Sequence, residues 1–246
     1  MADGGSGIKI DPMEQFEIVP FFGSELTALS FTNSSLWMLL VVITASLVLV
    51  LGASGRALVP SRLQSVTEMT YDFIRRTVQD TAGDEALKYF PYIFTVFVFV
   101  LLSNLLGLIP YSFTVTSHLA VTATLALAVF ITVTIIGFAK HGVKFLELFV
   151  PHGAPAPLLV LLVPIEVISY FVRPFSLSVR LAANMLAGHA VLKVFAGFVV
   201  AMSFAGALPL LVMIGIYALE VLVALVQAYI FTILSCVYLK DALHMH

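Results

Sequence analysis

The sequence predicts an all-α integral membrane protein with five membrane crossings, one amphipathic surface helix and a long, strongly tilted helical hairpin at its C-terminal end. Its 246 residues are 61% hydrophobic and only 11% charged, whereas soluble domains carry about 25% charged residues. Apolar runs long enough to cross about 30 Å of hydrocarbon recur along the chain. The last two runs are longer than one upright crossing needs, and no internal repeat of the kind found in many transporters is visible.

The first part of the chain, residues 1–34, is an acidic arm with a single basic residue. It lacks the basic region of a signal peptide and the arginine-rich character of a transit peptide. The first apolar run, 36–51, with its flanks just crosses a bilayer. Polar residues at 33–35 are candidates for its N-cap, and Gly52 and Gly55 indicate its end.

Residues 61–82 carry a different pattern. Apolar and threonine side chains recur there at helical spacing, and charged residues fill the remaining arc. This pattern is typical of an amphipathic helix that lies on the membrane surface, or against other helices there. The apolar face comprises Leu63, Val66, Thr70, Phe73, Ile74 and Thr77.

Two more apolar runs, 90–109 and 118–139, complete a predicted region of three spans that covers residues 35–157. The first of them stops at the segment Gly-Leu-Ile-Pro, and the second contains no fully charged side chain. Each is long enough for one crossing. A loop rich in proline and glycine follows, at 140–157, and separates these spans from the hairpin.

The predicted hairpin, residues 158–246, contains the apolar runs 158–204 and 208–239. As one helix of roughly 46 residues, the first run would extend about 69 Å, against a hydrocarbon core of about 30 Å. It must therefore be strongly tilted, or break near Pro164 or Pro174. A strong tilt also lets both ends reach water, which explains why charged side chains are tolerated on it.

Orientation follows from the distribution of lysine and arginine. These residues gather between the first two spans, in the loop after the third span and in the C-terminal tail. The N-terminal arm has one, and the links 110–117 and 204–209 have none. The positive-inside rule therefore predicts that the N-terminus lies outside and the C-terminus inside the cell.

Arg180 is the most informative residue, because it lies within an apolar run. Its guanidinium stays protonated at any ordinary pH. At the centre of a membrane helix it costs about 3 kcal/mol on insertion scales, so it indicates a functional site. Residues four and seven apart share a helix face. The resulting polar stripe comprises Glu166, Arg173, Ser176, Arg180 and Asn184. The alternative is a set of polar groups that only specify packing, and Ser176 in particular is common at helix interfaces.

His189 lies nine residues after Arg180, which places it on the opposite side of the helix. A lone histidine in an apolar helix is often a hydrogen-bonded core residue. However, the last helix carries Glu220 and Gln227 seven residues apart, and a buried glutamate needs a partner or a proton. His189 is a natural partner, and the two could relay protons near neutral pH. Gln227 is equally suited to bond Arg180 or Asn184 across the hairpin.

Three segments resemble subunit a of the F-type ATP synthase: SNLLGLIP at 103–110, SLSVRLAANMLAGH at 176–189 and LVQAYIFTILSCVYL at 225–239. The order of elements is similar too, with one span, an amphipathic helix, two spans and a long hairpin. The resemblance covers nearly all of the chain after about residue 30. The Arg-xxx-Asn element paired with a glutamine in the last helix is its most specific part.

This resemblance implies that the hairpin wraps a ring of c subunits, and that peripheral-stalk b-type subunits and membrane lipid are the other partners. Arg180 is then the essential arginine that meets the ring carboxylate between two offset half-channels. The outer path is implied to use Asn104, Asn184, His189, Glu220 and Gln227, and the inner path Glu166, Arg173 and Ser176. Some bacterial relatives exchange the histidine and the carboxylate between the two helices, which supports their acting as a pair.

The predicted function is proton translocation by a stator subunit that makes no phosphate bond itself, in an energy-transducing membrane such as the bacterial inner membrane. The sequence has no P-loop, HExxH or GxSxG motif, and we expect no cofactor, metal or nucleic acid. A self-contained ion channel or secondary transporter is the rival hypothesis. The missing repeat and the lack of a carboxylate one turn from Arg180 count against it. A metal-dependent enzyme would rest on the His-Met-His tail alone, which is weak evidence.

Overall fold

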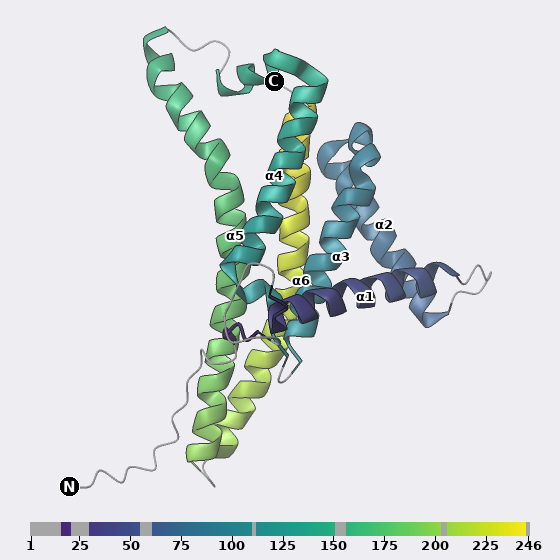
Figure 1. Ribbon diagram of the computed structural model, residues 1–246, viewed down its shortest axis with the longest axis vertical. Coiled ribbons are helices and arrows are strands. Elements are labelled where there is room, and N and C mark those ends of the chain that lie inside the picture. Colours follow the sequence, from purple (N-terminus) through teal and green to yellow (C-terminus); the bar gives the residue numbers. More distant parts are fainter. Residues whose placement is uncertain are drawn as a thin grey trace.

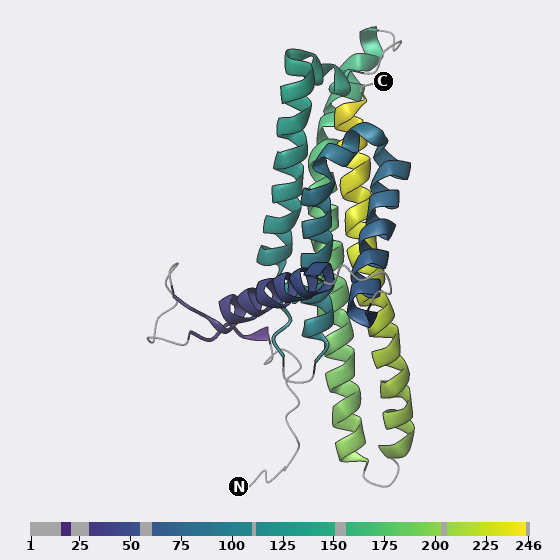
Figure 2. The same ribbon diagram turned by 90° about the vertical axis from the view of Figure 1, so that its right-hand side faces the viewer.

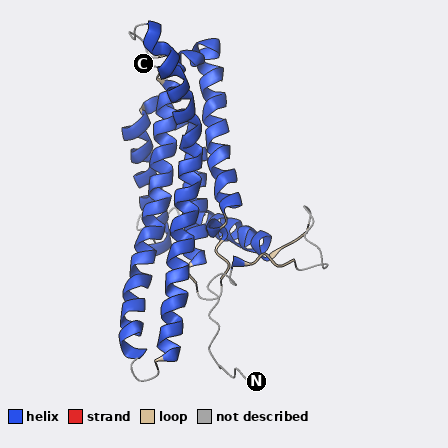
Figure 3. Ribbon diagram, turned by 90° about the vertical axis from the view of Figure 1, so that its left-hand side faces the viewer, coloured by secondary structure: helices blue, strands red, loops and turns tan. Residues whose placement is uncertain are grey.

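The structure is a computed structural model that describes residues 16–20, 30–54, 61–109, 112–150, 156–202 and 206–244. Within these ranges the chain is helical, and the only extended pairing is an isolated bridge between Pro20 and Thr32 (Figure 3). The α-helices are α1 (Asn33–Ser54), α2 (Arg62–Ala82), α3 (Phe90–Gly107), α4 (Leu119–His141), α5 (Ala156–Ala201) and α6 (Ala207–Leu243). Short 3₁₀ helices are η2 (Asp84–Tyr89), η3 (Val115–Ser117) and η4 (Gly142–Phe149). Five helical segments, all except α2, are long and apolar enough to cross a membrane, which confirms the predicted number.

Helix α1 begins where the sequence predicts, but its cap and its end differ in detail. The hydroxyl of Thr32 accepts a hydrogen bond from the backbone N–H of Ser35, at 3.4 Å, so the capping residue directly precedes the predicted candidates. Gly52 does not end the helix. It lies inside α1, and a Cβ there would meet the hydroxyl oxygen of Thr67 at 2.3 Å. The glycine therefore allows α1 and α2 to approach closely; Gly55 lies outside the described residues.

Helix α2 is amphipathic as predicted, but the predicted apolar face divides into two parts. Ile74 and Thr77, with Val78, are buried in the second half of the helix. Val66 and Phe73 are exposed instead. The reason is that α2 packs against α1, α3 and α6, so its side chains divide between these contacts and the surface. The exposed ring of Phe73 lies at the edge of the contact with α6, with its centroid 5.3 Å from that of Tyr229. The exposed side chain of Val66 suits contact with lipid.

Helix α5 is continuous over 46 residues, and neither Pro164 nor Pro174 ends it. The sequence allowed either a strongly tilted helix or a broken one. Because the helix is continuous, the tilted alternative remains. A helix about 69 Å long fits a core of about 30 Å only when inclined by about 64° from the membrane normal. Helix α1 crosses the α5–α6 hairpin steeply in two perpendicular views (Figures 1 and 2). Its 22 residues, about 33 Å, match an upright crossing beside a tilted hairpin.

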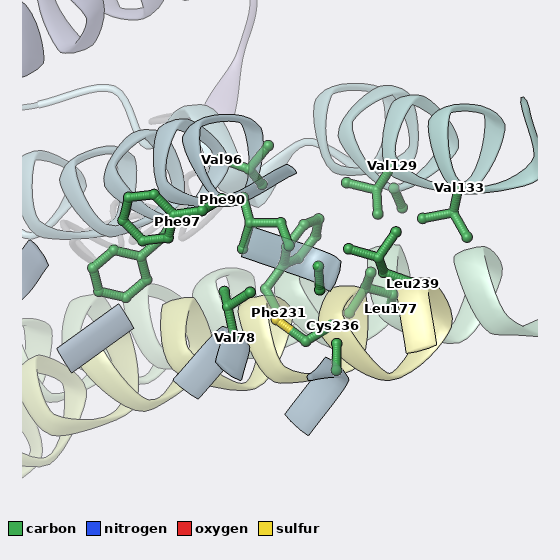
Figure 4. Packing of buried hydrophobic residues seen from close by; sticks show 14 of the residues in the cluster. Val78, Phe90, Val96, Phe97, Val129, Val133, Leu177, Phe231, Cys236 and Leu239 are labelled. Atoms are coloured by element: carbon green, nitrogen blue, oxygen red, sulfur yellow. The ribbon is translucent and has the colours of Figure 1, made fainter. Parts of the chain in front are cut away.

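The hydrophobic core lies where α2, α3, α4 and α5 surround the second half of α6. Phe231 and Leu239 of α6 are its central side chains, and Phe97 of α3 and Val129 of α4 pack toward them (Figure 4). Cys236 is fully buried in the same cluster, as expected for a residue used in packing. This core fixes α3 and α4 against one half of the hairpin.

Polar contacts anchor the C-terminal end of α6. The ammonium of Lys140 and the ring of His141 both donate to the carbonyl oxygen of Leu243, at 3.1 and 3.2 Å. Cationic groups at a helix C-terminus also interact favourably with the helix dipole. Arg173 of α5 donates to the carboxylate of Asp241 at 2.7 Å. By contrast, the last turns of α5 and the first turns of α6 extend past the other helices (Figures 1 and 2).

Candidate functional site

The two sides of α5 differ sharply around residue 180. Arg180 and Asn184 are exposed, and Arg180 forms no ion pair with the residues that the structure describes. On the other side Leu181, Met185 and His189 are 1%, 2% and 9% exposed. Arg180 and His189 therefore point to opposite faces of one helix, as their spacing of nine residues predicts.

His189 meets Glu220 of α6 inside the protein. Nδ1 of the imidazole lies 3.4 Å from Oε1 of the carboxyl group, and both side chains are about nine-tenths buried. Nδ1 and Oε2 of Glu220 are buried and make no hydrogen bond with the described residues. A Cβ on Gly188 would lie 1.8 Å from Oε1. The absence of a side chain at Gly188 is thus what lets the carboxyl group reach α5.

Asn104 lies in the last turns of α3 and is completely buried. Its amide nitrogen donates to the backbone carbonyl of Ala224, at 3.2 Å. Its amide oxygen accepts from the hydroxyl of Thr116, at 2.8 Å. Because Ala224 lies one turn after Glu220 on α6, Asn104 joins three elements next to the His189–Glu220 pair.

The link between α3 and α4 completes this cluster. The hydroxyl oxygen of Thr114 lies 2.8 Å from Nε2 of His189, and the backbone oxygen of Gly107 lies 2.9 Å from the same nitrogen. Thr114 also donates to the Gly107 oxygen at 3.2 Å, and Ser112 does so at 2.8 Å. The link therefore lines the site with hydroxyl groups, each held by a backbone or side-chain partner.

These hydroxyl groups are the functional candidates that sequence reasoning missed. The link was notable only for its lack of charge, yet Thr114 and Thr116 are 1% and 0% exposed. A signal was present in the sequence, because hydroxyl residues alternate with apolar ones in SFTVTS at 112–117. Nothing in that pattern names the partner, which lies 75 residues away on α5.

A cavity of about 1110 Å³ opens beside the buried pair. It lies between the hairpin, the start of α1 and the end of α3. The lining residues include Trp37, Ser112, His189, Lys193 and Tyr217. The hydroxyl of Tyr217 donates to the backbone oxygen of Leu108, at 3.2 Å, and ties α6 to the wall of the cavity. Water in this cavity can reach the imidazole from the side of α5 opposite Arg180.

Part of the N-terminal arm also contacts the site. Phe16 is 8% exposed, and its ring centroid lies 6.2 Å from that of His189. The side chain of Asn33 holds this segment, with its amide nitrogen 2.9 Å from the backbone oxygen of Glu17. Burial lowers the pKa of nearby His118, and a hydrogen bond with the backbone of Phe16 partly opposes this effect. His118 is therefore held toward its neutral form.

The remaining predicted residues lie elsewhere on the hairpin. Gln227 is buried, at 4% exposed, on the face of α6 that carries Glu220. No hydrogen bond joins it to Arg180 or Asn184, all three of which the structure describes. Glu166 and Ser176 are half-buried on α5. Arg173, besides its contact with Asp241, stacks over the rings of Tyr170 and Tyr238.

The structure thus brings together Asn104, His189 and Glu220, and separates them from the exposed stripe around Arg180. It gathers no group of three or more histidine, cysteine, aspartate or glutamate side chains fit to hold a metal ion within the described residues.

A sequence profile of the family described as ATP synthase A chain matches residues 35–240. The chain belongs to this ATP synthase family. It is 58% identical to the ATP synthase subunit a of Dinoroseobacter shibae, over 98% of both chains. It is 54% identical to the ATP synthase subunit a of Rhodospirillum rubrum, over 96% of this chain and 99% of that one. The same identity and coverage hold for the ATP synthase subunit a of Bradyrhizobium diazoefficiens.

The match to the ATP synthase A chain family begins at Ser35, in the first turn of α1, and extends to Lys240 in the last turn of α6. Both the buried cluster and the exposed stripe of α5 therefore lie within the family region. Phe16 and its hydrogen-bonded neighbours precede that region, so their contact with His189 is a feature of this chain outside the matched segment.

Proposed function

We propose that the chain is the proton-translocating stator subunit of a rotary F-type ATP synthase, located in a bacterial inner membrane. The observation that carries this proposal is the division of α5 into two faces. One face exposes Arg180, and the other holds His189 against Glu220 beside a cavity of about 1110 Å³. A mechanism with two half-channels requires a fixed positive charge that faces the partner and a titratable pair that faces water.

The outer half-channel uses the cavity. Protons enter it from outside, pass His189 and Glu220 along the wall formed by Asn104, and reach a ring carboxylate near Asn184 and Gln227. The pair suits this role because imidazole is the side chain whose unperturbed titration falls near neutral pH. The predicted orientation of the chain agrees with this role. The start of α1 and the end of α3 line the cavity, and the positive-inside rule assigns both helix ends to the outside.

Arg180 separates the two half-channels. An ionised carboxylate of the ring is expensive to hold unpaired in lipid, and an always-charged guanidinium stabilises it. The same positive charge repels protons that would otherwise pass directly between the half-channels. A second ring carboxylate releases its proton toward the inner side, along Ser176, Arg173 and Glu166. The partners are the c-ring at the exposed face of α5 and peripheral-stalk b-type subunits.

The rival hypothesis, a channel or transporter that works alone, makes an opposite prediction. Within this chain Arg180 has no carboxylate partner among the described residues, and the carboxylate that completes the cycle belongs to the ring. We therefore expect proton flux into vesicles only when the chain is reconstituted with its ring. Comparable flux from the chain alone would support the rival.

The buried pair predicts a coupled effect of mutation. His189→Leu and Glu220→Leu should each impair passive proton conduction through the membrane sector, because each leaves the other group buried without its partner. The double variant should cost less than the sum of the two. Passive proton conduction is measured in vesicles that retain only the membrane sector of the complex, for the native protein, both single variants and the double variant. Strictly additive losses would mean that the two residues act in separate structures.

The two faces of α5 predict a pattern of chemical labelling, measured after Cys236 is replaced by alanine. Cysteine at Ser176 or Ala183 should crosslink to a ring helix, since both lie within about 60° of Arg180. Cysteine at position 189 should instead react with a water-soluble thiol reagent added from outside. Leu181→Cys, at a position 1% exposed, is the control that should do neither. Crosslinking of position 189 to the ring, without that of 176 and 183, would contradict the proposed faces.

A further inference from the structure

The carbonyl group of Gly107 determines which nitrogen of His189 carries a proton. Its oxygen lies 2.9 Å from Nε2, and Thr114 offers its hydroxyl oxygen to the same nitrogen at 2.8 Å. A hydroxyl group can donate or accept, but a carbonyl oxygen only accepts. A deprotonated Nε2 could accept the single hydroxyl proton of Thr114 only by taking it from the Gly107 oxygen, and its lone pair would still face that oxygen at 2.9 Å in a buried site. Nε2 therefore carries a proton.

The Gly107 carbonyl cannot readily turn away from His189. It ends the last turn of α3 and accepts additional hydrogen bonds from Ser112 and Thr114. Thr114 is itself packed against the backbone, because a Cβ on Gly107 would lie 2.8 Å from its Cγ2. The threonine thus fills the space left by the glycine and holds its hydroxyl between the carbonyl and the imidazole.

The other nitrogen faces Glu220. Nδ1 has no hydrogen bond within the described residues, and Oε1 of Glu220 lies 3.4 Å away. With Nε2 protonated, one further proton is needed between the two groups, because a bare Nδ1 beside a carboxylate would oppose two lone pairs. That proton sits on the carboxyl group, giving a neutral pair, or on Nδ1, giving an imidazolium and a carboxylate.

We propose that Thr114 is a positioning residue that holds His189 against the Gly107 carbonyl, so that Nε2 stays protonated and only Nδ1 exchanges a proton, with Glu220. In each exchange the O–H bond of Glu220 breaks and an N–H bond forms at Nδ1, or the reverse. A transported proton therefore enters and leaves the pair through the carboxyl group of Glu220, and it never crosses the ring from one nitrogen to the other. The proposal rests on the proposed function in one respect, namely that the exchanged proton is the transported one.

The protonation pattern can be measured without any transport. The complete complex in lipid is labelled with ¹⁵N-histidine, and the spectrum is compared with that of His189→Gln to identify the signals of position 189. Solid-state NMR distinguishes protonated from bare ring nitrogens by their ¹⁵N shifts. We expect Nε2 of His189 to carry a proton. A neutral ring protonated at Nδ1 alone would overturn the proposal, whether or not the chain transports protons.

Three variants test the part played by Thr114. Thr114→Val removes the hydroxyl at nearly constant volume and should produce a second His189 signal, with proton conduction lowered roughly fivefold to tenfold, as for one lost hydrogen bond. Thr114→Ser should restore both. Ser112→Ala removes a hydroxyl from the same carbonyl without touching the ring, and should leave the His189 spectrum unchanged. A native His189 spectrum in Thr114→Val would overturn the positioning role.

If Thr114→Val does not assemble with its partners, the native and Thr114→Ser spectra still decide the protonation at Nε2. If conduction fails in every variant and the native complex while Nε2 remains protonated, the proposed function is wrong and the tautomer assignment stands.

Discussion

Replacing Arg180 by alanine is expected to abolish ATP synthesis driven by a proton gradient, and lysine at this position is not expected to restore it. The residue is exposed and has no ion pair within the described chain, so its charge is available to a partner. Guanidinium is planar, always protonated and able to bind a carboxylate through two parallel hydrogen bonds. An ammonium group lacks that geometry and loses its proton more readily when it leaves water.

The measurement uses membrane vesicles energised by an imposed proton gradient, with synthesis and passive proton leak recorded in parallel. Arg180→Ala should lose synthesis and gain leak, because the barrier between the half-channels is gone. Arg75→Ala, at an exposed arginine of α2, is the matched control and should keep near-native synthesis. Synthesis by Arg180→Lys at a near-native rate would refute the role given to the guanidinium.

The second large effect is expected from Gly188→Ala. The added methyl group would lie 1.8 Å from Oε1 and 2.7 Å from Cδ of Glu220, so the carboxyl group must move away from His189. We expect passive proton conduction to fall more than tenfold. We also expect a loss of about 1–3 kcal/mol in stability from overpacking between α5 and α6.

Gly215→Ala is the control for this substitution, because a Cβ there meets nothing within 4 Å. It adds the same methyl group to the same hairpin and should change neither conduction nor thermal stability. The double variant Gly188→Ala, Glu220→Asp shortens the carboxylate side chain by one methylene. It should recover part of the passive proton conduction that Gly188→Ala loses. Native conduction in Gly188→Ala alone would show that the close contact between Glu220 and α5 is not needed.

Much of the fold could be predicted because the membrane restricts the alternatives. Backbone groups in hydrocarbon must be paired within the segment, so apolar runs of this length become helices. The positions of α3 and α4 differ from the predicted spans by only a residue or two at each end. The continuity of α5 did not follow from the sequence, because proline at 164 or 174 normally kinks or breaks a helix.

The site was predicted where one helix carries the information, or where a buried charged group needs a partner. The opposite directions of Arg180 and His189 follow from their spacing, and the proximity of Glu220 to His189 was inferred from its need for a partner. The contributions of Thr114, Gly107 and Gly188 depend on how α3, α5 and α6 pack, which spacing along one helix does not encode. The same applies to the contact between Arg173 and Asp241, whose residues lie 68 positions apart.

The hairpin is a cantilever within this chain. Its end near Leu243 is held to the end of α4 by Lys140 and His141, whereas the last turns of α5 and the first turns of α6 project past α3 and α4 (Figure 1). A sideways force on the projecting turns produces a bending moment that is greatest where the support by α3 and α4 begins. The His189–Glu220 pair lies where that support begins, because His189 contacts Gly107 at the end of α3. Elastic deflection under load would therefore change the separation of its two titratable groups.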